Sequence, residues 1–215
     1  MVFKELAGFD RAGAAEDFPN PNRALAHGPG AVLYAALVEI LLVHPEIPHN
    51  SGCAARLAAA TGTPLHLVEP LGFSLEDRYL KRAGLDYWPL VDLRVHAGLA
   101  EAVEALGGPA AFAERARLFS ARGGTSLFET EFGPDDVLVF GSESSGLPAD
   151  LLEQYGDRRV YVPIRAGVRS LNLANAVCLG LYTAMVRAGC PLPDNDGGHV
   201  RHPEAGAVRP ADRLA

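Results

Sequence analysis

Six short apolar runs, most of them rich in β-branched residues, alternate with helical patterns and restrict this chain to few architectures. The runs span residues 38–43, 65–68, 89–93, 118–121, 137–140 and 160–162. Continuous apolar strands are typical of parallel sheets, because helices cover both faces of such sheets. The sequence therefore predicts an α/β fold with a single, mostly parallel sheet.

The two ends of the chain differ in composition from this alternating region. Residues 1–35 are rich in Ala, Gly, Pro and Asn, and residues 194–215 lack apolar periodicity. We expect flexible extensions at both ends and one domain over residues 36–193, which is long enough for a sizeable core. Within that domain, Asn50 is expected to cap a helix that ends at Gly62, and a later helix is expected to begin at Ser170.

Composition and charge argue against several classes of protein. The longest apolar stretch, residues 31–43, contains Glu39 and is shorter than the roughly 20 residues of a membrane helix. The N-terminus lacks a signal-peptide pattern, so a cytoplasmic location is expected. A net charge of −7 argues against indiscriminate nucleic-acid binding but allows a local basic face. The cysteines have no metal-ligand spacing, so we expect reduced thiols and no metal at Cys53, Cys178 and Cys190.

Two glycine-containing loops follow predicted strands and outline a ligand pocket. Residues 141–148 read GSESSGLP, and residues 163–176 read PIRAGVRSLNLANA. Loops after adjacent parallel strands are the usual ligand sites of such sheets. We interpret Gly141 and Gly146 as positions where the backbone approaches a ligand, and Glu143 supplies the carboxylate of the loop. A plain turn is the alternative interpretation.

A third loop precedes the first long helix and carries Asn50, with Arg56 further along that helix. An amide and a guanidinium at a sheet edge suit a phosphate or a hydroxyl group. The alternative is a simple helix cap beside a solvated arginine. The common nucleotide and hydrolase motifs are absent: there is no Walker A phosphate loop, no GxGxxG between a first strand and helix, and no GxSxG.

In combination, the three loops resemble the motifs of the SpoU branch of the SPOUT RNA methyltransferases. The motifs read Asn50-x-Gly52-x-x-x-Arg56, Gly141-x-Glu143-x-x-Gly146-Leu147-Pro148 and Arg169-Ser170-Leu171-Asn172-Leu173-x-Asn175-Ala176. Residues 65–73 and 81–87 are similar to the TrmL-like tRNA wobble-nucleotide 2′-O-methyltransferases in particular. Cys53 and Ala54 depart from the family pattern, which often has a polar amide and a larger aliphatic residue at these positions.

The resemblance implies a trefoil knot near the C-terminus, a homodimer that completes each site, and S-adenosylmethionine as methyl donor. It places this cofactor mainly against backbone atoms, at Ala121, Gly141, Gly146, Val162, Ile164, Ser170 and Leu171. It assigns the reaction to Arg56, Asn50, Glu143 and Asn172. Because a guanidinium rarely loses its proton, we expect Arg56 to stabilise the developing alkoxide rather than act as a base.

The reaction requires a ribose 2′-hydroxyl, which makes RNA the expected substrate. A basic helix face at Arg78, Lys81 and Arg82 is expected to contact the anticodon stem-loop of tRNA, although a solvated helix face is the alternative. Arg169 and Tyr182 are further expected RNA contacts, with Tyr182 buried at a helix interface. The sequence thus predicts a tRNA 2′-O-methyltransferase acting on the wobble C or U. The alternatives are the same chemistry at another tRNA or rRNA position, and a catalytically silent knotted RNA-binding module.

Overall fold

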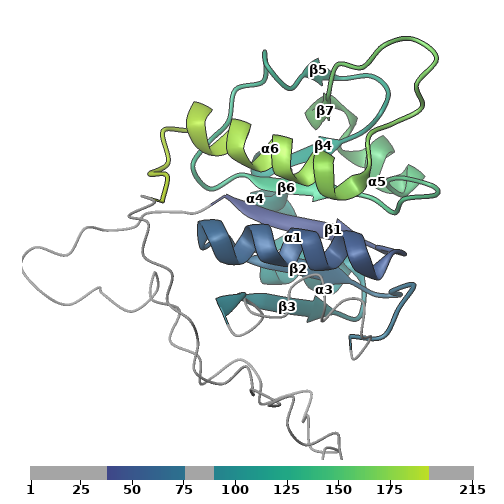
Figure 1. Cartoon of the computed structure of the whole chain (residues 1–215), viewed down its shortest axis with the longest axis vertical. Helices are drawn as coiled ribbons and strands as arrows, with labels where there is room; N and C mark the ends of the chain where they lie inside the picture. The colour runs from purple at the N-terminus through teal and green to yellow at the C-terminus, as the bar shows by residue number, and fades with distance from the viewer. Residues whose placement is uncertain (1–37, 76–89, 194–215) are drawn as a thin grey trace, which may run out of the picture. The chain divides into compact units, whose positions relative to one another are not determined.

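A parallel sheet runs through the part of the chain that the computed structural model describes, residues 38–75 and 90–193 (Figure 1). Within these residues, seven strands lie in the order β3-β2-β1-β6-β4-β7-β5, and all neighbouring strands pair in parallel. The strands are β1 (Glu39–Val43), β2 (Leu65–Val68), β3 (Leu93–His96), β4 (Ala116–Phe119), β5 (Thr125–Ser126), β6 (Val137–Phe140) and β7 (Arg159–Tyr161). The predicted single-sheet α/β fold is therefore confirmed, whereas the knot remains a prediction.

Helices cover both faces of the sheet, and each face has its own hydrophobic core. The helices are α1 (Pro48–Thr61), α3 (Leu99–Ala105), α4 (Gly108–Arg115), α5 (Ala149–Gln154) and α6 (Leu173–Arg187), with a short 3-10 helix, η2 (Gly156–Arg158). On one face, α1 and α6 lie side by side (Figure 1) and pack against Ile40 and Leu42. On the other face, α3, α4 and α5 pack against Leu41 and Val43. Alternate residues of β1 thus serve two cores, as expected for a strand buried on both faces.

Helix α6 approaches the sheet closely at Gly180. A Cβ atom at this position would lie 2.8 Å from the ring of Phe119, and Phe119 stacks on Phe140 with ring centroids 4.3 Å apart. Phe119 and Phe140 are the last residues of β4 and β6. The missing side chain of Gly180 therefore lets α6 sit directly over the ends of β4 and β6, where the stretch with Ala121 and the loop of residues 141–148 begin.

The strand order brings the predicted site loops to one edge of the sheet. Strands β1, β6, β4 and β7 are consecutive in the sheet although they are far apart in the sequence. Because all are parallel, the loops that follow them emerge at the same edge. The two strands that precede the glycine-containing loops, β6 and β7, are not adjacent, because β4 stands between them. The stretch after β4, which contains Ala121, thus leaves the sheet between the two glycine-containing loops.

Three predicted strands are displaced along the sequence, and β5 has no predicted counterpart. The affected predictions are residues 89–93, 118–121 and 160–162, which correspond to β3, β4 and β7. Polar residues inside these strands interrupt the apolar runs from which they were predicted. Arg94 pairs with Asp92 at 2.9 Å, and Arg117 pairs with the buried Asp136 at 3.1 Å. The arginines are tolerated because each has an acidic partner, which an apolar pattern does not reveal.

The predicted cap of α1 is wrong, although its end is correct. The helix begins at Pro48, a favoured residue for the first helical position, so Asn50 lies within the first turn. The backbone of Gly62 ends the helix in the left-handed conformation, with φ of 69°. The amide of Asn50 is therefore available for a task other than capping its own helix.

The start of α6 also differs from the prediction. The helix begins at Leu173 rather than at Ser170, and Asn172 is its N-cap. The side chain of Asn172 accepts a hydrogen bond from the backbone N–H of Asn175 at 3.3 Å. Ser170 and Leu171 consequently belong to the preceding loop. The helix expected to carry Arg78, Lys81 and Arg82 and the two terminal extensions lie outside the described residues.

Three further expectations concern membranes, thiols and metals. No helix within the described ranges combines the length and the apolar character needed to cross a membrane. The cysteines are free thiols, as predicted. Among the same residues, no group of three or more His, Cys, Asp or Glu side chains is arranged to hold a metal ion.

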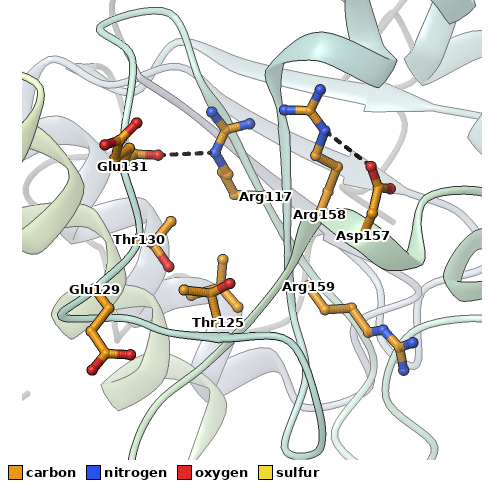
Figure 2. Close-up of a pocket in the computed structure, with 9 residues that line it drawn as sticks. Arg117, Thr125, Glu129, Thr130, Glu131, Asp157, Arg158 and Arg159 are labelled. Atoms are coloured by element: carbon orange, nitrogen blue, oxygen red, sulfur yellow. Dashed lines mark hydrogen bonds and ion pairs between the residues drawn. The ribbon is translucent and has the colours of Figure 1, made fainter.

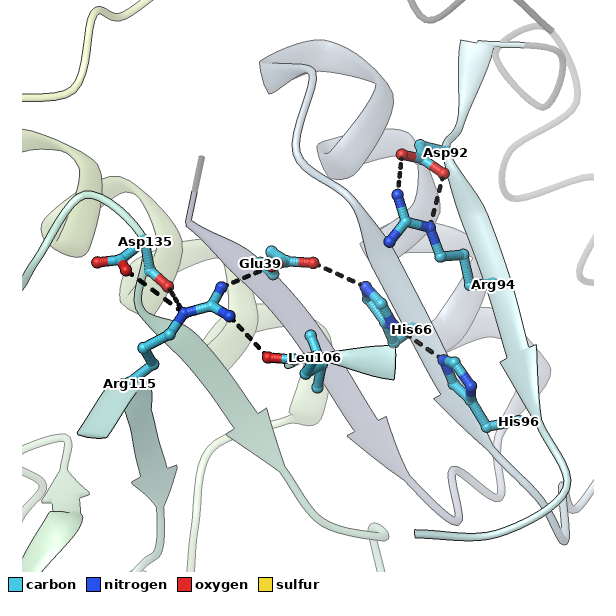
Figure 3. A network of polar contacts seen from close by, with 8 residues as sticks. All are labelled: Glu39, His66, Asp92, Arg94, His96, Leu106, Arg115 and Asp135. Carbon is cyan, nitrogen blue, oxygen red and sulfur yellow. Dashed lines mark hydrogen bonds and ion pairs between the residues drawn. The ribbon is translucent and has the colours of Figure 1, made fainter. Parts of the chain in front are cut away.

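A buried polar network crosses three strands on the face covered by α3 and α4 (Figure 3). Glu39 of β1 lies 2.9 Å from Nε2 of His66 and 2.7 Å from the guanidinium of Arg115. His66 lies 2.9 Å, through its Nδ1, from Nε2 of His96, and the two rings stack at 7°. A carboxylate only accepts hydrogen bonds, so His66 donates to Glu39 and, while neutral, accepts from His96.

This network determines how two groups respond to pH. Burial lowers the pKa of His96 below its ordinary value of 6.5, and the nearby His66 lowers it further. Burial alone raises the pKa of Glu39, but hydrogen bonds from His66 and Arg115 outweigh that effect and leave it below 4.5. Both groups therefore bind protons less readily in the folded chain than in the unfolded one.

We predict that the free energy of unfolding falls in two steps on acidification. The unfolded state protonates His96 first, so stability is lost as the pH drops from 6.5 toward the folded pKa of His96. A second loss, from Glu39, begins near pH 4.5 and continues through its folded pKa. The variant His96→Gln keeps an amide donor for His66 but does not titrate, so it should lack the first step. Urea unfolding at a series of pH values measures the free energy of unfolding. An equal loss of this free energy in variant and wild type as the pH drops from 6.5 would contradict the prediction.

Candidate active site

A carboxylate from a distant loop caps the amino end of α1. Ile47, the N-cap residue, offers no side-chain hydrogen bond to the exposed N–H groups of the helix start. Glu143 accepts instead from the backbone N–H of Glu46 at 2.8 Å and from that of Ile47 at 3.3 Å. A negative charge at this position also interacts favourably with the helix dipole. The loop after β6 therefore fixes where α1 begins.

Two asparagines extend this contact to the third loop. The buried Asn50 donates from Nδ2 to Glu143 at 2.8 Å, and its Oδ1 accepts from Nδ2 of Asn172 at 2.9 Å. Asn172 in turn caps α6. A continuous relay, Glu143–Asn50–Asn172, thus connects the loops that follow β6 and β7 to the first turn of α1. Three of the four predicted catalytic residues are brought together by direct hydrogen bonds.

The loop after β6 closes on itself, and its two glycines have different tasks. Ser142 and Gly146 exchange two backbone hydrogen bonds, of 3.1 and 2.9 Å. A Cβ atom on Gly141 would lie 2.0 Å from the backbone of Gly146. Gly141 therefore has to lack a side chain for this loop to close, and its close approach to a ligand stays a prediction. Gly146 has φ of +74°, and a Cβ atom added to it would meet nothing within 4 Å, so it gives the turn its left-handed residue and leaves room beside it.

The other predicted site residues that the structure describes differ in how exposed they are. Arg56 lies on the exposed face of α1, almost two turns after Asn50. Val162 and Ile164 are half-buried just after β7, whereas exposed positions are held by Ala121, Arg169, Ser170 and Leu171. Tyr182 is 40% exposed on α6, so its predicted burial is wrong. Arg78, Lys81 and Arg82 lie outside the described residues.

A family model described as the SpoU rRNA methylase family matches residues 37–182. The chain belongs to this SpoU family. The predicted resemblance is thereby confirmed. Among its relatives is a tRNA (cytidine(34)-2′-O)-methyltransferase of Burkholderia ambifaria, which is 45% identical over 156 residues, 71% of this chain and 97% of the relative. A protein of the same name from Methylovorus glucosotrophus is 46% identical over 149 residues, 69% of this chain and 94% of the relative.

Solved structures show the same fold. One, described as giving structural insights into the 2-OH methylation of C/U34 on tRNA, has 48% identity and a TM-score of 0.64, and the match covers 71% of this chain and 96% of that one. The SpoU methyltransferase AviRb of Streptomyces viridochromogenes, solved with AdoMet, has 23% identity and a TM-score of 0.61, over 70% of this chain and 60% of that one. At this lower identity, the likeness to AviRb concerns the fold alone.

The sequence interpretation missed a contact between two of the loops that carry the motifs. Glu46 accepts hydrogen bonds from the hydroxyl group of Ser144 at 2.6 Å and from its backbone N–H at 3.2 Å. Glu46 precedes the first motif, and Ser144 occupies a position of the second motif that the family pattern leaves unspecified. The signal that connects them is spatial, because 98 positions separate them in the chain.

A pocket of about 320 Å³ lies away from the SpoU motifs (Figure 2). It is found near the amino ends of β4, β5 and β7, at the opposite end of the strands from the three loops. Its lining includes three arginines and three acidic residues: Arg117, Arg158, Arg159, Glu129, Glu131 and Asp157. Arg117 and Arg158 contact acidic partners, and Arg159 donates to a backbone carbonyl. Mutual neutralisation of these charges leaves the pocket without a dominant sign for a ligand, so we do not assign the SpoU reaction to it.

We predict that alanine has different effects at the two glycines of the SpoU loop. Gly146→Ala should cost about 1 kcal/mol, because only a left-handed backbone is strained. Gly141→Ala should cost about 3 kcal/mol or more and weaken cofactor binding, since its Cβ would overlap the backbone of Gly146. Chemical denaturation and titration calorimetry measure the two quantities. Equal destabilisation by the two variants would contradict the loop geometry.

Proposed function

We propose that this chain transfers a methyl group from S-adenosylmethionine to the 2′-hydroxyl of the wobble nucleotide of tRNA, C or U. Relatives more than 40% identical bear the name tRNA (cytidine(34)-2′-O)-methyltransferase and are covered almost entirely by the match. The observation that carries the proposal is the Glu143–Asn50–Asn172 relay, which joins all three motif loops at one sheet edge. A tRNA substrate also favours a cytoplasmic location.

The loops suit a cofactor that is bound mainly by backbone atoms. S-adenosylmethionine supplies, when bound, a methyl group on a positively charged sulfur that a ribose oxygen can attack in line. The exposed position of Ser170 and the space beside Gly146 leave backbone groups of two loops accessible. The residues assigned to this task are Ala121, Gly141, Gly146, Val162, Ile164, Ser170 and Leu171. Holding cofactor and ribose in an attacking geometry can by itself supply a large part of the rate.

Arg56 is the residue assigned to the developing charge on the ribose oxygen. Its guanidinium keeps its proton, so its contribution is hydrogen bonding and positive charge in the transition state. The relay holds the first turn of α1, and a rigid helix transmits that position to Arg56. Glu143 already accepts three hydrogen bonds from the start of α1, which suits it to positioning rather than to proton transfer.

The substrate is assigned to a surface that continues from the cofactor loops. Arg169 is exposed in the loop before α6, and Tyr182 is exposed on α6 itself. A cation and an aromatic ring are the groups that bind phosphates and stack on unpaired bases. Together with Arg78, Lys81 and Arg82, they are proposed to contact the anticodon stem-loop.

We also propose that two copies of the chain pair through α6. Val186 on this helix is 61% exposed. Beyond the helix, Leu192 is 45% exposed, and Val168 in the preceding loop is 54% exposed. Apolar side chains gathered on one helix and its flanking loops are typical of a protein interface. This face adjoins the third motif loop, so a partner copy would stand beside the site.

We predict that the purified wild-type protein incorporates labelled methyl groups into tRNA and that Arg56→Ala lowers kcat roughly a hundredfold or more. Cofactor affinity should change little, because Arg56 is assigned to the ribose and not to the cofactor. Arg158→Ala, which removes an equal charge at the other end of the sheet, is the matched control. A large loss of cofactor binding in Arg56→Ala would contradict the assigned role.

Mapping the labelled nucleotide distinguishes the proposal from its alternatives. Label at the wobble ribose supports the proposed substrate. Label at another tRNA position, or only in ribosomal RNA, would favour the same chemistry on a different target. A protein that binds RNA but transfers no methyl group would favour the silent RNA-binding module.

We predict that Val186→Glu weakens the dimer by about tenfold or more, because a charge would be buried without a partner. Sedimentation equilibrium across a range of protein concentrations measures the dissociation constant. Leu90→Glu is the control, because Leu90 is 50% exposed but lies away from α6 in the sequence and beside β3. Equal effects of the two substitutions would place the interface elsewhere.

A further inference from the structure

Glu46 and Glu143 form a reciprocal clamp between two loops. The carboxylate of Glu143 accepts from the backbone N–H groups of Glu46 and Ile47. The carboxylate of Glu46 accepts from the hydroxyl group and the backbone N–H of Ser144. Each carboxylate therefore holds the segment that carries the other. Neither loop can shift without breaking hydrogen bonds in both directions.

The clamp keeps two negative charges near one another, which requires compensation. Within the part of the chain that the structure describes, each carboxylate meets backbone N–H groups rather than a basic side chain, and the loops fix the direction of these donors. Hydrogen bonds to an ionised acceptor are shorter and stronger than neutral ones, in keeping with the 2.6 Å contact between Ser144 and Glu46. The two acidic residues are stable side by side only while both loops keep this arrangement.

A third segment supports Glu46 from its backbone side. Gly72, in the loop after β2, donates its N–H to the carbonyl group of Pro45 at 2.9 Å. A Cβ atom on Gly72 would lie 2.5 Å from the backbone oxygen of Glu46 and 2.6 Å from its Cα. The backbone of Glu46 is thus held against a neighbouring loop while its side chain reaches Ser144. This fixed backbone makes Glu46 a rigid anchor for the loop after β6.

We propose that Glu46 is a positioning residue that sets the conformation of the cofactor loop, residues 141–146. It acts through Ser144, whose placement aligns Glu143 with the start of α1 and presents the adjoining peptide groups of the loop to the cofactor. The role at the cofactor rests on the proposed function. Ser144 is exposed and lies outside both hydrophobic cores, so loss of the contact should leave the fold intact.

Three variants test this inference: Glu46→Ala, Glu46→Gln and Ser144→Ala. Glu46→Ala removes both hydrogen bonds and should weaken S-adenosylmethionine binding about tenfold in calorimetry, with far-ultraviolet circular dichroism unchanged. Glu46→Gln keeps an acceptor oxygen and should restore part of the affinity. Ser144→Ala keeps the backbone donor and should also have an intermediate effect. Glu46 and Ser144 share one contact. The double variant Glu46→Ala/Ser144→Ala should therefore bind S-adenosylmethionine no more weakly than Glu46→Ala alone. Glu153→Ala, an exposed carboxylate on α5, is the matched control.

Hydrogen exchange of the protein alone separates this inference from the proposed function. In Glu46→Ala, the amides of residues 141–147 should exchange at least about tenfold faster than in the wild type, with or without methyl transfer. Wild-type exchange and wild-type cofactor affinity in Glu46→Ala would overturn the proposal. Faster exchange with unchanged affinity would also overturn the positioning role, since the loop would move without effect on the cofactor. A wild-type protein that transfers no methyl group to RNA would refute the proposed function, while the exchange result would still decide on the clamp.

Discussion

The carboxylate of Glu143 replaces the N-cap that α1 does not provide for itself, and the arrangement of the site follows from that contact. Through it, the loop after β6 fixes the first turn of α1 and thereby the positions of Asn50 and Arg56. The backbone N–H groups at the start of a helix need hydrogen-bond acceptors, and an active site needs its loops held in place. One charged group meets both requirements because it comes from a different loop.

The sheet makes this contact possible, since it aligns the ends of strands that are distant in sequence. Strands β1 and β6 are direct neighbours, with Leu42 paired to Phe140, so the loops after them start side by side. Gly180 lets α6 rest on the ends of β4 and β6, which brings Asn172 at its amino end close to the same edge. The polar relay is short because the apolar core has already placed its three members.

The sequence predicts those parts of the fold that depend on local pattern, and its errors occur where distant residues decide. Apolar runs are sufficient for β1, β2 and β6, which are buried on both faces. They fail at β4, where Arg117 interrupts the run and depends on Asp136 for compensation. The loop motifs identify Asn50 and Glu143 through the family resemblance, but the local rule for caps misassigns Asn50. Nothing in the sequence near Glu46 indicates a contact with Ser144, since the two meet only after the sheet forms.

The relay also explains why an amide is required at its centre. Asn50 must donate to Glu143 and accept from Asn172 at the same time, and a primary amide offers both functions in one plane. An aspartate there would still accept from Asn172 but would face Glu143 with a second negative charge, close to the pair already formed with Glu46. An alanine would remove both hydrogen bonds at a position where Asn50 is only 2% exposed, so Glu143 and Asn172 would each lose a partner. Asn50 thus connects Glu143 to Asn172, and it uses both its donor and its acceptor to do so.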